Sequence, residues 1–229
     1  MDLRNMEELH LTMDERREKS RREILSASLE IFYIKGYQKT TTRDIIKRAG
    51  ILNGSLYNRF KSKEDILVCI VTEYLENTLK ECEKILGEEK NPIIAAVLPG
   101  ALEVYASSIS VRAADLIYEA HRLWGAVEQY AKTNLEWFNG YLERFGISMG
   151  ETADASMKML AFLGVIGNFC GYYAHGGKAE VDKVFRFIVP YMGALMNIPV
   201  FDMDSTISRL TDIVRENTCG MFDENIPTE

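Results

Sequence analysis

The residues best suited to chemistry lie in the first third of the chain, where short polar side chains alternate with cations. Asn53 and Ser55 carry hydrogen-bond donors and acceptors of the kind that read base edges in DNA, and Gly54 between them permits close approach. Hydroxyl, guanidinium and ammonium groups nearby can hold phosphates. The candidate DNA contacts are Thr41, Thr42, Arg43, Asn53, Gly54, Ser55, Tyr57, Asn58, Arg59, Lys61 and Lys63.

The charge of the chain is unevenly distributed. Its 229 residues include 27 Lys and Arg against 34 Asp and Glu, a formal net charge of -7. Between Arg16 and Lys63, however, 13 basic residues face four acidic ones, a local net of +9, and the remaining 14 basic and 30 acidic residues carry -16. An acidic total therefore does not argue against DNA here, and we expect DNA contact to be confined to residues before about Asp65.

Metal, redox and enzyme chemistry find no support in the sequence. The cysteines form no C-x-x-C pair and have no neighbouring histidine, so neither a zinc site nor a cofactor is expected. No nucleophile-base-acid set or phosphate loop is present, which argues against an enzyme with a DNA-binding appendage. The residues concerned are Cys69, Cys82, Cys170, Cys219, His10, His121 and His175.

The expected location is the cytoplasm, without a membrane partner. The N-terminal segment has no apolar stretch that could serve as a signal peptide or an anchor, and the widely spaced cysteines favour reduced thiols. The run from Met159 to Gly177 is uncharged, but five glycines, Asn168 and His175 interrupt it. A tightly packed buried helix is therefore favoured there over a membrane span.

The elements that must position the polar residues are short helices. Apolar spacing predicts an amphipathic helix from Arg21 to Phe32 that ends at Gly36, with Tyr37 packing back on its last turn. A capping box over 41–44 begins a second helix, which Gly50 ends, and a third follows over 53–60. This order predicts a helix-turn-helix over about 41–60. A surface helix with a solvated polar face is the alternative, which the basic segment disfavours.

At this point the residues carry a family resemblance. The stretch RREILSASLEIFYIKGYQKTTTRDIIKRAGILNGSLYNRFKSKEDIL, about 47 residues, resembles the DNA-binding domain of the TetR family of transcriptional regulators. It contains the elements F-x-x-x-G-Y, T-T-x-x-D-I, A-G-x-x-x-G-[ST]-L-Y-x-x-F and S-K-E-x-L in order. The resemblance implies an all-α homodimer with a three-helix DNA-reading head and a C-terminal helical domain for ligand and dimerisation. It places Thr41, Thr42, Gly54, Ser55, Tyr57 and Lys63 on positions that usually contact operator DNA.

Two departures from the family pattern bear on DNA reading. Leu52 stands where the family usually has a Ser or Thr cap before the recognition helix, so Asn53 can take over the cap and be less free to read bases. Arg59 replaces the usual His or Tyr before Phe60, and its guanidinium should strengthen phosphate contact.

The expected organisation is an extension over 1–18, a DNA-binding domain over 19–65 and a ligand-binding and dimerisation domain over 66–229. Ser62 begins a capping pattern for a helix that runs to about Leu86, and Asn91-Pro92 begin another, which Pro99-Gly100 should kink or restart. No alternating strand pattern appears. Further helical patterns cover 102–109, 112–122, 124–145, 152–175, 179–197 and 205–218.

A dimer interface is predicted on the helices over 152–175 and 179–197, because spaced glycines let another backbone approach closely. The family resembled forms an intersubunit four-helix bundle at this chain position. Ordinary packing within one chain is the alternative. The predicted interface residues are Gly164, Gly167, Gly171, Val184, Phe187, Ile188, Tyr191 and Leu195.

Candidate effector contacts are polar or aromatic residues on otherwise apolar helices, each of which can equally be a satisfied core residue. Among them, His121 and Arg122 can receive a carboxylate or phosphate on an otherwise apolar molecule. The candidates are Tyr105, Tyr118, His121, Arg122, Trp124, Trp137, Phe138, Asn168, Tyr172 and His175.

The function indicated is a ligand-responsive repressor that binds a palindromic operator as a homodimer. A small, largely apolar effector would release it by binding better to the arrangement that does not bind DNA. A transcriptional activator and a ligand-independent DNA binder remain as alternatives, because activation or repression depends on where the operator lies.

Overall fold

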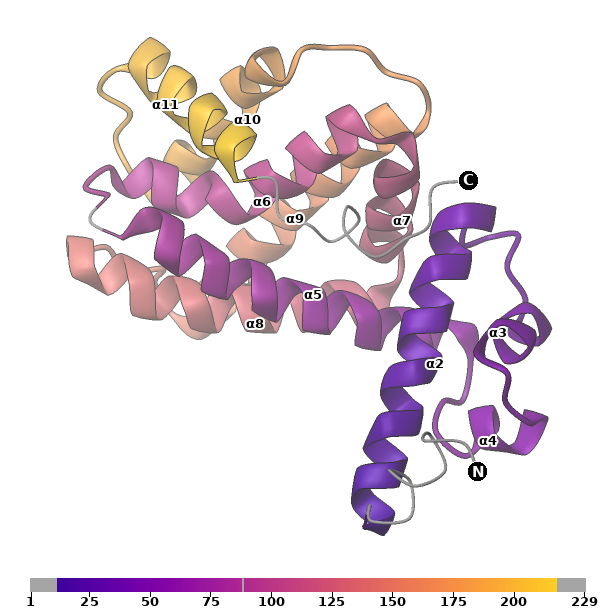
Figure 1. Ribbon diagram of the computed structural model, residues 1–229. Helices are drawn as coiled ribbons and strands as arrows, with labels where there is room; N and C mark the ends of the chain where they lie inside the picture. The colour runs from indigo at the N-terminus through magenta and orange to yellow at the C-terminus, as the bar shows by residue number, and fades with distance from the viewer. Residues whose placement is uncertain (1–11, 88, 218–229) are drawn as a thin grey trace. The chain divides into compact units, whose positions relative to one another are not determined.

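The computed structural model describes residues 12–87 and 89–217, which form ten α-helices, one 3-10 turn and no strand (Figure 1). The all-α prediction is therefore confirmed for this part of the chain. His10 and Cys219 lie outside the described residues. The chain divides between Ile70 and Val71 into an N-terminal and a C-terminal unit, inside helix α5.

The N-terminal unit packs three helices and the start of a fourth around a small apolar core. Ile24, Phe32, Ile45, Leu56 and Phe60 are buried in it. The two short helices of the unit, over 42–49 and 53–57, depend on this shared core, because isolated helices of that length are unstable in water. The helices are α2 (Met13–Lys35), α3 (Thr42–Ala49), α4 (Asn53–Tyr57) and α5 (Lys63–Leu86).

Helix α2 begins at Met13, eight residues before the predicted start at Arg21. A capping box explains the difference: the Glu15 N–H donates to Thr12 Oγ1 at 3.2 Å, and the Thr12 N–H donates to Glu15 Oε2 at 2.7 Å. The periodicity of apolar residues could not reveal these turns, because residues 13–19 are all exposed.

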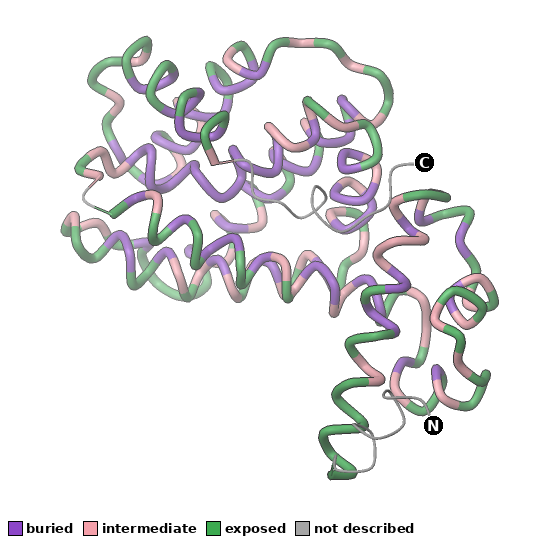
Figure 2. The backbone as a smooth tube through the Cα atoms, in the orientation of Figure 1, coloured by how far each residue is buried: buried purple, intermediate pink, exposed green. Residues whose placement is uncertain are grey.

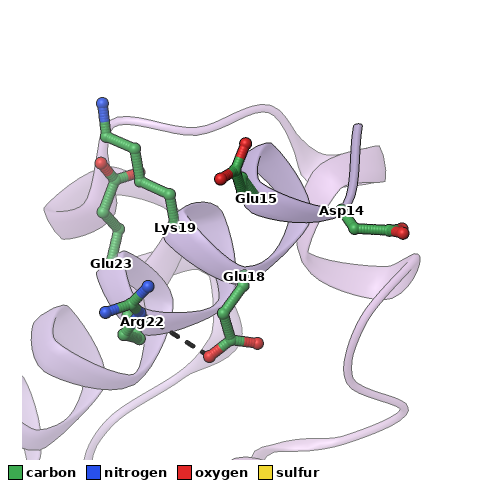
Figure 3. Close-up of a pocket in the computed structure, with 6 residues that line it drawn as sticks. All are labelled: Asp14, Glu15, Glu18, Lys19, Arg22 and Glu23. Atoms are coloured by element: carbon green, nitrogen blue, oxygen red, sulfur yellow. Dashed lines mark ion pairs between the residues drawn. The ribbon is translucent and has the colours of Figure 1, made fainter. Parts of the chain in front are cut away.

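The first turns of α2 carry charge of both signs. Figure 3 shows four carboxylates and two cations there, with an ion pair from Arg22 Nε to Glu18 Oε1 at 3.7 Å. This surface is therefore not a continuation of a purely basic face. The residues drawn are Asp14, Glu15, Glu18, Lys19, Arg22 and Glu23.

The ends of the next elements follow the sequence closely, with one exception. Gly36 ends α2 with a φ of 84°, and the ring of Tyr37 packs edge-on against Phe32 at 5.1 Å, as predicted. Gly50 ends α3 in the left-handed conformation. Helix α4, however, ends at Tyr57 and not near 60, because the chain tightens there: the Arg59 N–H donates to the carbonyl three residues back, at 3.0 Å.

The C-terminal unit is built around helix α6, which is buried along most of its length (Figure 2). Helices α7, α8, α9, α10 and α11 all pack against it. The bounds are α6 (Pro92–Ile109), α7 (Val111–Arg122), α8 (Trp124–Leu142), η1 (Glu143–Phe145), α9 (Thr152–Ala174), α10 (Val181–Met196) and α11 (Met203–Glu216).

Helix α6 continues through Pro99, so the helix does not restart at Pro99-Gly100, one of the two predicted outcomes. The ring of Pro99 removes one backbone hydrogen bond, but the neighbouring helices that cover α6 stabilise the continuous helix. In the described part of the chain α6 is also the one helix long and apolar enough to cross a membrane; 72% of it is buried inside the unit, as in a core helix.

Two of the glycines assigned to a dimer interface serve packing within the chain. A Cβ at Gly167 would lie 2.7 Å from His121 Cβ, and one at Gly171 would lie 2.6 Å from Tyr118 Cε2, so both glycines admit helix α7. Val184 and Ile188 of α10 are likewise buried within the unit. Their assignment to the interface is corrected, since a surface already covered by the same chain cannot contact a second copy.

We predict opposite effects for two matched Gly→Ala changes in α9. Gly167→Ala forces a methyl group against His121 and should lower the free energy of unfolding by about 1–3 kcal/mol. Gly164→Ala meets nothing within 4 Å and should leave it unchanged or raise it by up to about 1 kcal/mol, the difference in helix propensity. Urea unfolding followed by circular dichroism measures both. Equal effects would show that α7 and α9 are not in close contact at Gly167.

Candidate nucleic-acid interface

Helix α4 presents a polar face that the rest of the N-terminal unit leaves open. Asn53, Gly54 and Asn58 are exposed and Ser55 is half-buried, while Leu56 alone of the helix is fully buried. A Cβ at Gly54 would meet nothing within 4 Å, so the packing of the chain does not require glycine there. The missing side chain instead keeps the surface low, which suits close approach of another molecule.

Tyr57 links the two short helices. Its hydroxyl lies 3.1 Å from Thr42 Oγ1 in the first turn of α3, and its side chain is 55% exposed. A phenol and a hydroxyl are thus held side by side at the surface. One hydroxyl of the pair donates to the other, which leaves the second O–H able to donate to an acceptor such as a phosphate oxygen.

Thr41, which is also a predicted phosphate contact, makes hydrogen bonds within the chain. Its N–H and its hydroxyl both donate to Asp44 Oδ2, at 2.8 and 2.7 Å, and its Oγ1 accepts from the Asp44 N–H at 3.3 Å. Lys35 Nζ also lies 2.6 Å from the same carboxylate oxygen. Lys35 and Thr41 hold the pKa of the Asp44 carboxyl well below its usual range. Thr41 therefore caps α3, and the charge of Asp44 is compensated by Lys35.

Two of the predicted phosphate-binding cations also turn toward the chain. Lys63 Nζ donates to the carbonyls of Tyr37 at 2.8 Å and Thr40 at 3.0 Å, and it lies 4.2 Å from the centre of the Tyr37 ring. Arg59 is half-buried and donates to the carbonyl of Ser55 at 3.1 Å. Both side chains position the backbone of the unit. Arg43 and Lys61 are exposed at the surface.

The start of α4 resolves the question that Leu52 raised. Leu52 occupies the N-cap position, with no side-chain hydrogen bond to the helix, and Asn53 is the first helical residue. Asn53 therefore does not take over the cap, and its exposed amide remains at the surface. Leu52 itself was not among the predicted contacts, although it is 80% exposed. The one sequence signal that pointed to Leu52 was that it replaces the Ser or Thr usual at this capping position.

In the C-terminal unit, half of the predicted effector contacts come together. A cleft of about 290 Å³ is lined by α7, the start of α8 and α9. Its apolar wall was missed, because Val127, Leu160 and Leu163 have the spacing of ordinary core residues. The predicted residues in the cleft are Tyr118, His121, Arg122, Trp124 and Asn168.

The other predicted effector contacts lie elsewhere in the unit. Trp137 and Phe138 pack with Tyr141 in an aromatic cluster on α8. Tyr172 accepts hydrogen bonds from the N–H groups of residues 178 and 179, and His175 contacts the ring of Tyr118 edge-on at 5.4 Å. Tyr105 is half-buried on α6. The sequence could not separate these groups, because helical spacing does not show which helices meet.

His121 is paired inside the unit with a residue that sequence reasoning missed. Its Nε2 lies 2.7 Å from Glu103 Oε2, and both side chains are buried. Burial, together with the nearby Glu103 carboxylate, raises the pKa of the Tyr130 phenol. His121 also lines the cleft, so a polar pair stands behind one wall of an otherwise largely apolar space.

Known proteins resemble this chain in two ways: in the sequence of the N-terminal unit and in the overall fold. Residues 24–69 match the model of the bacterial regulatory proteins of the tetR family. Over 73 residues the chain is 37% identical to the HTH-type transcriptional repressor KstR2 of Mycolicibacterium smegmatis, covering 32% of this chain and 36% of that protein. The aligned part thus spans about a third of that relative's length.

Two solved structures share the fold over most of the chain. A structure of RolR with the ligand resorcinol superposes with a TM-score of 0.60 at 13% identity, covering 86% of this chain and 95% of that one. A putative TetR-family regulator from Syntrophomonas wolfei gives 0.57 at 16% identity, covering 81% and 99%. The N-terminal segment is thus similar to the tetR family model over residues 24–69, and the chain as a whole shares the all-helical fold of these two structures.

Proposed function

We propose that this protein is a cytoplasmic transcriptional repressor that binds a palindromic operator as a homodimer and is released by a small, largely apolar effector. The observation that carries the proposal is the open polar face of α4, joined to α3 by the contact between Tyr57 and Thr42. The similarity of the head to KstR2, which is named a repressor, supports it. An activator and a ligand-independent DNA binder are the alternatives.

Phosphate binding in this proposal falls to the cations that the chain does not use for its own packing. Arg43 lies in the first turn of α3 and Lys61 follows α4, so the two flank the polar face along the sequence. Each phosphate that a cation neutralises releases condensed counterions, which makes binding depend on salt. The side chains of Asn53 and Ser55 would read base edges.

Salt dependence tests the assignment of Lys61. Lys61→Ala should lower the magnitude of the slope of log K against log salt concentration by about one for each protomer that loses its contact. The matched control is Lys84→Ala, which removes an exposed lysine from the C-terminal unit and should leave the slope unchanged. Anisotropy titrations with the protein's own upstream DNA measure both. An unchanged slope in Lys61→Ala would remove this residue from the interface.

Dimerisation is proposed because a single five-residue helix contacts too few base pairs for tight, specific binding. The C-terminal unit offers a suitable surface on α9 and α10, where Met157, Tyr172 and Phe187 are exposed. The rings of Phe169 and Phe187 lie 6.5 Å apart and connect the two helices. Large exposed apolar side chains on one pair of helices are typical of an interface between subunits.

A charge placed on this surface should separate the subunits. Phe187 is 68% exposed, and Phe187→Asp should raise the dimer dissociation constant roughly tenfold or more, because buried aromatic residues dominate such interfaces. Phe201→Asp is the control, since Phe201 is 94% exposed outside both helices. Sedimentation at micromolar concentrations reports the assembly state. If the unaltered chain is already monomeric, the dimer proposal is wrong.

The effector is proposed to occupy the cleft in the C-terminal unit. Leu160 and Leu163 give it an apolar wall. The guanidinium of Arg122 lies 5.4 Å from the centre of the Tyr118 ring and 3.4 Å from Glu119 Oε1, so an effector carboxylate would share this cation with Glu119. A small apolar molecule with a carboxylate fits this combination. Helix α5 is continuous across the division between the units. We propose that it transmits the conformational change caused by effector binding to the N-terminal unit.

Fluorescence tests this site, because Trp124 lines the cleft and the sequence has one other tryptophan. Octanoate should change the tryptophan emission saturably and release bound DNA. In Arg122→Gln the affinity for octanoate should fall about tenfold, because a charge-assisted hydrogen bond is lost. Trp124→Phe should remove the signal but keep the release. Resorcinol, the ligand of RolR, is a second probe. Failure of both probes to release DNA would favour the ligand-independent alternative.

A further inference from the structure

Leu52 is an apolar side chain placed where a polar one would stabilise the protein. It occupies the N-cap position of α4 and makes no side-chain hydrogen bond to the helix, although Ser, Thr, Asp and Asn are favoured there because they satisfy a free backbone N–H. It is also 80% exposed, so folding removes little of its surface from water. The described residues thus give Leu52 neither the benefit of a cap nor that of a core residue.

The surroundings of Leu52 indicate what would cover it. The preceding residue, Ile51, is half-buried, and the next two, Asn53 and Gly54, are exposed and not apolar, so Leu52 is the one exposed apolar side chain in this stretch. It stands at the N-terminal end of the recognition helix, where side chains of helix-turn-helix proteins meet base edges. The major groove offers one apolar group at those edges, the C5-methyl of thymine.

We propose that Leu52 reads thymine in the operator by covering its C5-methyl group. The inference rests on the proposed function, because it assigns one base preference to the same interface. Gly54 supports it, since the absence of a Cβ two residues away leaves space for the duplex to approach. Leu52 thereby gives up a cap that stabilises the head and gains a contact that exists only in the complex with DNA.

The test combines substitution of Leu52 in the protein with removal of single thymine methyl groups in the DNA. Duplexes that the full-length protein enriches from a random pool are resynthesised with each thymine replaced in turn by deoxyuridine, which lacks only the C5-methyl. Dissociation constants at fixed salt are compared for the unaltered protein, Leu52→Ala and Leu52→Ser. The control is Ile109→Ala, because Ile109 is an exposed apolar residue of the C-terminal unit.

One thymine in each half-site should be sensitive to the loss of its methyl. Replacing it should weaken the unaltered protein about fourfold, the equivalent of burying one methyl group, and roughly fifteenfold when both half-sites are changed. Ile109→Ala should keep this sensitivity. Leu52→Ala and Leu52→Ser should both lose it, although Ser restores a capping hydroxyl and so keeps the head folded.

The outcomes separate the inference from the proposed function. The proposed methyl contact is wrong if the protein binds specifically but no thymine is sensitive, or if Leu52→Ala and Leu52→Ser keep the same sensitivity. Either outcome is still consistent with the proposed function as a DNA-binding regulator. If the unaltered protein enriches no sequence from the pool, the proposed function fails and the role of Leu52 fails with it.

Discussion

Helix α4 has only five residues, too few to be stable alone, so the DNA recognition proposed for it depends on the contacts that hold this helix in place. The side chain of Leu56 is fully buried beneath it, and Tyr57 bonds to Thr42 on α3. Helix α3 is in turn held by its capping box and by the ion pair between Arg48 and Glu30. The orientation of the exposed face of α4 is therefore set by the contacts on its buried face and by helix α3.

The same requirement explains how the head uses its cations. Lys35 compensates the carboxylate of Asp44 at the start of α3. Lys63 donates to two carbonyls in the turn that precedes α3, and Arg59 donates to a carbonyl of α4. Some cations of this basic segment therefore bond within the chain, whereas others are exposed at the surface. The net charge of the segment does not show which side chains belong to which group. Arg43 and Lys61 are among its exposed cations and are the ones proposed to attract DNA.

The C-terminal unit depends on close approach between α7 and α9, which Gly167 and Gly171 permit. This approach brings His121 against α9 and places it in the wall of the cleft, with Glu103 behind it. A buried pair of this kind contributes little net stability, because removing two polar groups from water offsets their attraction, but loss of either member would leave the other unsatisfied. The cleft therefore has one wall whose geometry is tightly constrained.

By itself the sequence determined the all-helical class, the caps at Thr41 and Ser62, the ends at Gly36 and Gly50 and the polar face of α4. These features follow from periodicity and from hydrogen bonds between residues a few positions apart, which a sequence contains explicitly. Only the tertiary structure decided that Lys63 turns inward, that Gly167 and Gly171 serve α7, and that Glu103 pairs with His121. Each of these joins residues far apart in the chain or on different helices, and the spacing of one helix does not specify which side chain another helix brings to it.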